Sequence, residues 1–164
     1  MPSEMQPPPR VVPDDDNGYF EVLTKAVFQS GFRWSVVEAK WPNFREAFAG
    51  FDIDTVAGFG PPDVDSLSGD EGLIRNVKKI AATIDNAAAM QDIIAEHGSV
   101  KSWLDTTADL PWPDRRTALG EPFKFLGPFG VYVFLWSVGE AVPPHEQRDE
   151  WTGPVPPGAP ESLA

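Results

Sequence analysis

The chain has 164 residues, enough for one domain built around a single hydrophobic core. It contains no cysteine, which excludes a disulfide framework and any thiolate metal site. Its formal net charge of -12 argues against a broad basic surface for nucleic acid, so any contact with phosphates has to be local.

The two ends of the chain differ in composition from its middle. Residues 1–17 hold five prolines and three consecutive aspartates, and residues 143–164 are also rich in proline and acid. We therefore expect disordered tails on either side of one helical domain, residues 18–142. The segments outside residues 19–139 carry a charge of -7, which leaves -5 for the core. Because the chain shows neither a signal-peptide pattern nor a long apolar run, we expect a cytoplasmic protein without membrane contact.

The first helix is predicted over residues 16–30, where apolar residues recur at helical spacing. Asp16 or Asn17 is placed to act as its N-cap, and Gly31 is expected to end it. A second helical unit begins near Arg33 and closes at Gly50. Pro42 suits the first turn of a helix, which places a helix start inside this unit.

Two short helical elements, residues 52–59 and 62–67, are predicted next. The most strongly periodic helix follows over residues 76–96, with a broad apolar stripe. Residues 99–105 form another short helix, and residues 106–122 are expected to be extended or turning because they contain Pro111, Pro113, Gly120 and Pro122. The final element, residues 128–138, is apolar nearly all round and therefore buried. Strand signals are scarce, so the predicted fold class is all-α.

The stretch from Leu67 to Ile80 has the layout of a DNA-binding hairpin. A short helix ends in a glycine-bearing turn, and a long helix with basic residues in its first turn follows. Such a turn presents backbone N–H groups where the helix dipole favours a phosphate. Helix, glycine turn and helix is also a common structural arrangement, and the cluster of Arg75, Lys78 and Lys79 is equally explained as a solvated helix face.

Four motifs, in order and at matching intervals over residues 19–139, resemble those of the 3-methyladenine-DNA glycosylase I family, part of the helix-hairpin-helix DNA glycosylase superfamily. They are Gln29-Ser30-Gly31-Phe32-Arg33-Trp34, Asn43-Phe44-Arg45-Glu46-Ala47-Phe48, Asp70-Glu71-Gly72-Leu73-Ile74-Arg75-Asn76-Val77-Lys78-Lys79-Ile80 with Asn86-Ala87 beyond it, and Phe123-Lys124-Phe125-Leu126-Gly127-Pro128.

The resemblance implies a function in DNA base-excision repair. A protein of this kind extrudes an alkylated adenine of the 3-methyladenine type from double-stranded DNA into an aromatic pocket and hydrolyses its N-glycosidic bond. Trp34 matches the pocket tryptophan of the family and Gln29 lies beside it, although an ordinary core indole is the alternative for Trp34. The resemblance assigns DNA contacts to Gly72, Ile74, Arg75, Asn76, Lys78, Lys79 and Lys124.

The sequence departs from the family at several positions that matter for chemistry. The family's glutamate, eight residues before the pocket tryptophan, is here Ala26, which can neither accept a hydrogen bond nor stabilise a cation. The family's N-terminal aromatic segment is replaced by proline-rich sequence, and its Cys/His zinc clasp is absent. His97 and His145 are interpreted as surface histidines, so we expect neither a metal nor a cofactor.

Another carboxylate could take the missing role. Glu38, one turn after Trp34, is the candidate catalytic residue, whereas Glu21 is not expected to share the direction of Ala26. A cationic leaving group such as 3-methyladenine makes a modest demand on a general base, which favours activity. The alternative function is a catalytically inactive module on the same scaffold that binds DNA, a protein or a small ligand.

Overall fold

The computed structural model describes residues 10–29 and 33–159. These residues form α-helices and short 3-10 turns without a strand, which confirms the all-α prediction. The elements are α1 (Asp16–Gln29), α2 (Trp34–Ala47), η2 (Ala49–Phe51), α3 (Ile53–Ala57), α4 (Pro61–Ser68), α5 (Val77–His97), α6 (Val100–Asp105), α7 (Trp112–Gly120), α8 (Pro128–Ser137) and η3 (His145–Gln147).

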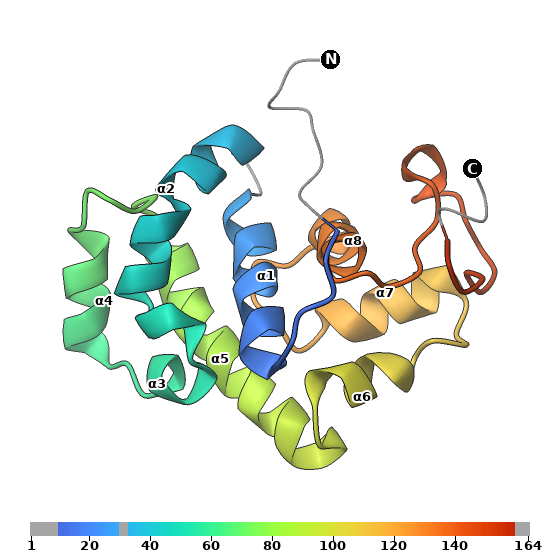
Figure 1. Cartoon of the computed structure of the whole chain (residues 1–164), viewed down its shortest axis with the longest axis horizontal. Helices are drawn as coiled ribbons and strands as arrows, with labels where there is room; N and C mark the ends of the chain where they lie inside the picture. Colours follow the sequence, from blue (N-terminus) through green and yellow to red (C-terminus); the bar gives the residue numbers. More distant parts are fainter. Residues whose placement is uncertain (1–9, 30–32, 160–164) are drawn as a thin grey trace.

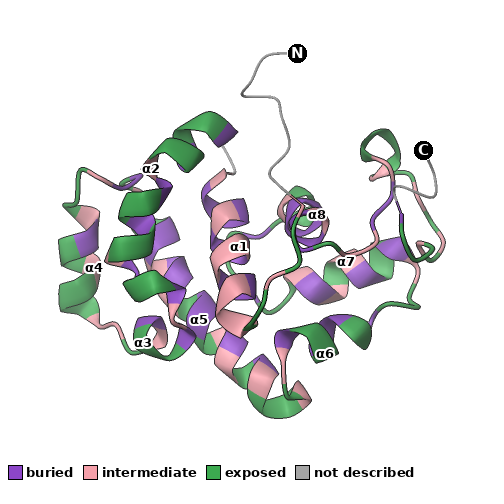
Figure 2. Cartoon of the chain, in the orientation of Figure 1, coloured by how far each residue is buried: buried purple, intermediate pink, exposed green. Residues whose placement is uncertain are grey.

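Helix α1 lies at the centre of the domain and joins its two halves (Figure 1). It contacts α2 and α3 on one side, α6 and α8 on the other, and α5 beneath. The long helix α5 also contacts α3, α4 and α6, and so runs under both halves. Helix α8 is buried along most of its length (Figure 2), as its uniformly apolar sequence predicts.

Aromatic side chains form the core between α1, α2 and η2. The ring of Trp41 stacks on Phe44 at 4.9 Å and on Phe51 at 5.1 Å between ring centroids. Phe28 and Phe20 of α1 meet this stack edge-on. Such offset and edge contacts stabilise a core beyond the burial of area alone, so the second half of α2 is held firmly against α1.

The N-caps of this region differ from the sequence prediction. Asp15, not Asp16 or Asn17, caps α1 by accepting the Gly18 N–H at 2.8 Å. Asp16 accepts the Val100 N–H at the start of α6, and Asn17 accepts the Ile53 N–H at the start of α3. A local pattern identifies residues able to cap a helix but not the helix end that tertiary packing brings to them.

Prolines account for two further differences. Pro42 lies inside α2, which runs unbroken from Trp34 to Ala47 instead of starting afresh at the proline. Residues 106–122, expected to be extended, contain α7. Pro113 occupies the first turn of α7, where a missing N–H costs no hydrogen bond, so a residue interpreted as a helix breaker begins one.

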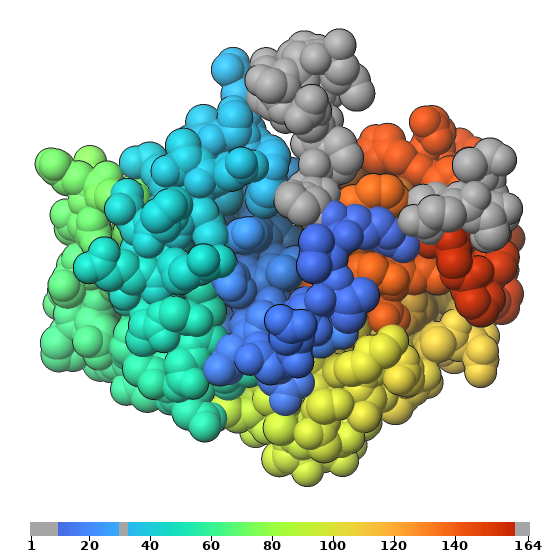
Figure 3. Space-filling view, viewed as in Figure 1, coloured from blue at the N-terminus to red at the C-terminus, as the bar shows by residue number. Residues whose placement is uncertain are grey.

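The described parts of both terminal segments pack on the domain, in contrast to the disorder expected for them. Arg10 donates to the carbonyls of Trp136, Glu140 and Ala159, and Val11 N–H donates to the Ser137 carbonyl at 2.9 Å. The described residues from Arg10 onward therefore lie against α8 (Figure 3). Near the other end, the Arg148 carbonyl accepts the indole N–H of Trp112 at 2.8 Å.

Asn86 fixes the turn that precedes α8. From the middle of α5, its Oδ1 accepts the Lys124 N–H at 2.8 Å and its Nδ2 donates to the Lys124 carbonyl at 3.1 Å. Asn86 is fully buried, so both backbone groups depend on it for hydrogen bonds. This link ties two of the sequence motifs together.

We expect Asn86→Ala to lower the free energy of unfolding by about 1–3 kcal/mol, because it removes two part-buried hydrogen bonds to the Lys124 backbone, each worth about 0.5–1.5 kcal/mol. Urea denaturation measures the change. Asp85→Ala is the matched control, since it removes only the exposed ion pair between Asp85 and Lys124 and should cost less than about 1 kcal/mol. Equal stability losses in the two variants would contradict this role of Asn86.

Candidate functional site

A small cavity of about 200 Å³, here called the inner cavity, lies between α1, the start of α2, α8 and the N-terminal segment. It is lined by Val11, Val22, Lys25, Ala26, Gln29, Trp34, Val133 and Ser137. It therefore brings together the predicted pocket residues Trp34 and Gln29 with Ala26. Binding sites for larger organic ligands usually measure about 300–1,000 Å³, so this volume suits a single small heterocycle.

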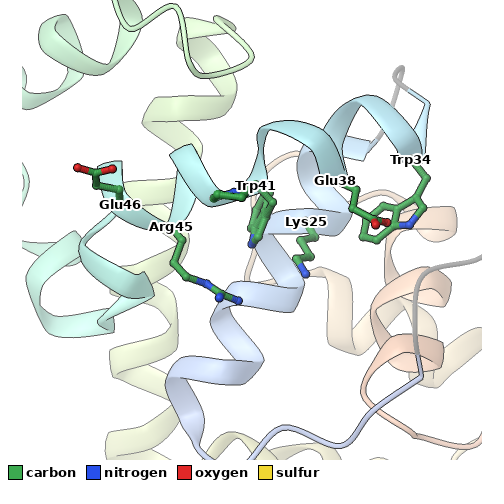
Figure 4. A pocket seen from close by; sticks show the side chains of 7 residues that line it. Lys25, Trp34, Glu38, Trp41, Arg45 and Glu46 are labelled. Carbon is green, nitrogen blue, oxygen red and sulfur yellow. The ribbon is translucent and has the colours of Figure 1, made fainter.

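A second and more open depression, the outer cleft, also borders Trp34 (Figure 4). Its volume is about 570 Å³, and it is lined by Lys25, Trp34, Glu38, Trp41, Pro42, Arg45 and Glu46. Lys25 and Trp34 border both hollows. Trp34 is 7% exposed and therefore largely buried. Its indole forms a wall shared by the inner cavity and the outer cleft.

Gln29 lines the inner cavity and carries an unsatisfied hydrogen-bond acceptor. Its Oε1 is buried and has no hydrogen-bond partner among the described residues. A buried acceptor without a partner costs about 1–3 kcal/mol, so this oxygen favours a ligand or water that can donate to it. The sequence motif identified Gln29, but only the structure shows that its amide oxygen is unsatisfied. The next three residues of that motif, 30–32, lie outside the described residues.

The two carboxylates considered for the missing acidic role are placed differently. Glu38 is exposed on α2 and lines the outer cleft next to Trp34, and it does not line the inner cavity (Figure 4). Glu21 accepts the Trp41 indole N–H at 2.8 Å and pairs with Arg45 at 2.6 Å. Glu21 therefore holds α1 against α2 and does not point at the cavity.

Lys25 lines both hollows and was not singled out by sequence reasoning. Its ammonium lies 5.8 Å from the ring centroid of Trp34 and 5.3 Å from that of Trp41, within cation–π range of both. Burial lowers the pKa of Lys25, which the nearby Glu21 carboxylate partly offsets. One signal was present: Lys25 is one turn before Gln29 on the same helix, so the two side chains share a face.

The hairpin turn between α4 and α5 is held by polar contacts on both sides. Asp70 Oδ1 accepts the Gly72 N–H at 2.8 Å, and Asn43 Nδ2 donates to the Gly72 carbonyl at 3.2 Å. Lys40 donates to the Glu71 carbonyl at 3.3 Å. The Gly72 N–H, expected to face a phosphate, is thus bonded to a carboxylate of its own turn.

The remaining predicted DNA contacts fall into accessible and buried groups. Arg75 and Lys78 are exposed, whereas Lys79 is 7% exposed and burial lowers its pKa. Ile74 lies in the core, so only its backbone can reach a ligand. Asn76 caps α5 by accepting the Lys79 N–H at 3.1 Å. Lys124 is exposed and forms an ion pair with Asp85 of α5. Lys124 is distant from the hairpin turn in the sequence, but this ion pair links it to α5.

Helix α2 connects the hairpin to the cavity. Its first residue is Trp34, and Asn43, nine residues later, bonds to the turn at Gly72. At a rise of 1.5 Å per residue the two positions lie about 14 Å apart along the helix. The turn and the cavity are therefore neighbours along one rigid element.

Neither histidine belongs to a cluster of ligands. His97 lies 3.7 Å from Glu96, and His145 packs against the rings of Phe129 and Tyr132. Across residues 10–29 and 33–159, no group of three or more His, Asp or Glu side chains is arranged to hold a metal ion. In the same residues, no helix combines the length and apolarity that crossing a membrane requires.

In this all-helical domain a glycine turn between two helices is linked through α2 to a tryptophan-walled cavity, the arrangement implied by the resemblance to helix-hairpin-helix DNA glycosylases. The family model described as methyladenine glycosylase matches residues 10–120, which is more than half of the chain. The chain therefore belongs to the methyladenine glycosylase family.

Characterised relatives support this assignment. The chain is 27% identical over 144 residues to the DNA-3-methyladenine glycosylase of Haemophilus influenzae, with 76% of this chain and 78% of that protein covered. It is 39% identical over 79 residues to DNA-3-methyladenine glycosylase 1 of Escherichia coli, covering 48% and 42% respectively.

Solved structures of the same family share the fold. A crystal structure of 3-methyladenine DNA glycosylase I superposes with a TM-score of 0.69 at 26% identity, covering 79% of this chain and 81% of that one. A tyrosine variant of such an enzyme, solved in complex with 3-methyladenine, gives a TM-score of 0.70 at 25% identity, with 82% and 80% covered.

We expect Asp70→Asn to raise the affinity for duplex DNA about fivefold at low salt. The asparagine oxygen can still accept the Gly72 N–H, whereas the negative charge beside the turn, worth about 1 kcal/mol against a phosphate, is lost. Fluorescence anisotropy with an undamaged duplex measures the affinity. Asp114→Asn on α7 is the control for net charge. An equal gain in both variants, or none in either, would show that DNA does not approach this turn.

Proposed function

We propose that this protein recognises an alkylated adenine in double-stranded DNA and hydrolyses its N-glycosidic bond. Family membership supports this reaction, and the observation that carries it for this chain is the inner cavity. There an indole wall and the unsatisfied Gln29 oxygen border a space of about 200 Å³, suited to one base. A base extruded from the duplex loses stacking in DNA and recovers part of it against Trp34.

Each element of the site has a part in this reaction. The hairpin between α4 and α5, with Arg75 and Lys78, positions the phosphate backbone. Gln29 accepts a hydrogen bond from an amino group or ring N–H of the base. The Glu38 carboxylate, next to Trp34 in the outer cleft, orients water and stabilises positive charge that develops on the sugar.

Trp34→Ala should reduce excision of methylated adenine from duplex DNA by about 5- to 150-fold, because stacking of a base on an aromatic ring contributes about 1–3 kcal/mol. Single-turnover release of the base measures this loss. Affinity for undamaged DNA serves as the control and should not change. The contradicting outcome is that wild-type protein releases no base while Trp34→Ala binds methylated DNA as tightly as wild type. The protein would then be an inactive binding module, the alternative function that Ala26 favours.

Lys78→Ala should weaken binding to damaged and undamaged duplexes alike and reduce the slope of log affinity against log salt by about 1, as expected for one lost phosphate contact. Titrations between 50 and 200 mM salt, roughly the range in which such contacts are lost, determine this slope. Lys101→Ala, on α6, is the control and should leave the slope unchanged. An unaltered slope in Lys78→Ala would remove the hairpin from the DNA interface.

A further inference from the structure

The charge of the inner cavity is reversed relative to the family pattern. Ala26 stands where the family pattern has a glutamate, and the adjacent Lys25 lines the same cavity, with its ammonium near the rings of Trp34 and Trp41. We propose that Lys25 makes this site selective for an uncharged alkylated adenine and donates a proton to a ring nitrogen of the base as its N-glycosidic bond breaks. This inference rests on the proposed function and narrows its substrate class.

The position of Lys25 excludes a second cation from the cavity. Its ammonium faces the rings of Trp34 and Trp41 at 5.8 and 5.3 Å, the location that a positively charged base would otherwise use. A cationic base placed against Trp34 would meet a like charge, with no carboxylate from position 26 to compensate. An uncharged base meets instead a hydrogen-bond donor, Lys25, and an acceptor, Gln29.

No nearby group neutralises Lys25 by direct contact. Among the described residues it forms no ion pair within 4.0 Å. The charged groups that face it are Glu21 on its own helix, and Glu38 and Arg45 on α2. Glu21 is already paired with Arg45, and the residues that the N-terminal segment and α8 contribute to the cavity carry no charge. The lysine proton therefore remains available to a ligand.

The chemistry explains why a donor and an uncharged base belong together. A base that is alkylated to a cation leaves as a neutral molecule when the bond between C1′ and the ring nitrogen breaks. An uncharged base would leave as an anion unless a proton reaches it. Here the electron pair of that bond passes to the base, Lys25 gives its proton to a ring nitrogen, and water adds to C1′ and loses a proton to solvent or Glu38. Such proton donation typically accelerates a reaction about 10²–10⁴-fold.

The test compares two duplexes that differ in one base: 1,N6-ethenoadenine, which is uncharged, and 3-methyladenine, which is cationic in DNA. Wild-type protein should accelerate loss of the uncharged base, relative to its spontaneous rate, by a larger factor than loss of the cationic base. Lys25→Met should lose about 100-fold or more on the uncharged base and gain on the cationic one, because the like charge that opposes the cation is removed. Lys25→Arg keeps the charge but cannot release a proton, so it should bind the uncharged lesion and fail to excise it. Lys101→Met is the control and should resemble wild type.

The pH profile gives a readout that a purely structural lysine would not change. Burial lowers the pKa of Lys25, so the wild-type rate on the uncharged base should fall as the pH rises through that lowered value. Lys25→Met should lose this descending limb. Equal losses on both lesions in Lys25→Met, or an unchanged pH profile, would overturn the proposal.

Failure of the proposed function is distinguished by calorimetry on nucleosides, which needs no catalysis. If neither base is excised, binding of 1,N6-ethenoadenosine is compared with that of 1-methyladenosine, which is positively charged at neutral pH. Tighter binding of the uncharged nucleoside, reversed in Lys25→Met, would uphold the selectivity of Lys25 while the glycosylase activity fails. Tighter binding of the cation by wild-type protein would overturn the selectivity itself.

Discussion

The structure depends on the burial of α1 between two groups of helices. Its aromatic side chains meet the Trp41 stack on one side, and it packs against α8 on the other. Because α1 is held on both sides, the residues at its C-terminal end have a fixed direction, and Lys25, Ala26 and Gln29 all line one cavity. A shift of α1 would close that cavity and separate Gln29 from Trp34 at once.

The charges that could attract or repel an anion lie close to the start of α5, whatever the net charge of the chain. A chain with a net charge of -12 still presents exposed Arg75 and Lys78 at the start of α5, and the helix dipole adds to their attraction for an anion. The carboxylate of Asp70 opposes them within the same turn. The local attraction for an anion therefore depends on the balance of these charges within the turn and not on the net charge of the chain.

Much of the fold could be predicted from sequence because helical periodicity and glycine turns are local signals. The long helix was expected over residues 76–96 and is found at Val77–His97. Helix α7 was not predicted because a proline is tolerated in the first turn of a helix but breaks a helix interior, and the sequence alone did not distinguish the two cases. For the site, the motifs identified Trp34 and Gln29. Lys25 and Val11 could not be identified from sequence because their positions depend on packing. A lysine is ordinarily a surface residue, and Val11 reaches the cavity only because Arg10 docks on α8.

The position of Val11 in the lining of the inner cavity affects how the binding site can change in evolution. Val11 belongs to a non-helical segment and is itself largely exposed, so it can be exchanged without repacking the core. A bulkier or smaller side chain there would reshape the space in front of Trp34 at little cost in folding free energy. One part of the cavity lining can therefore change without altering the core helices, whereas Lys25, Ala26 and Gln29 on α1 belong to the cavity and to the scaffold alike.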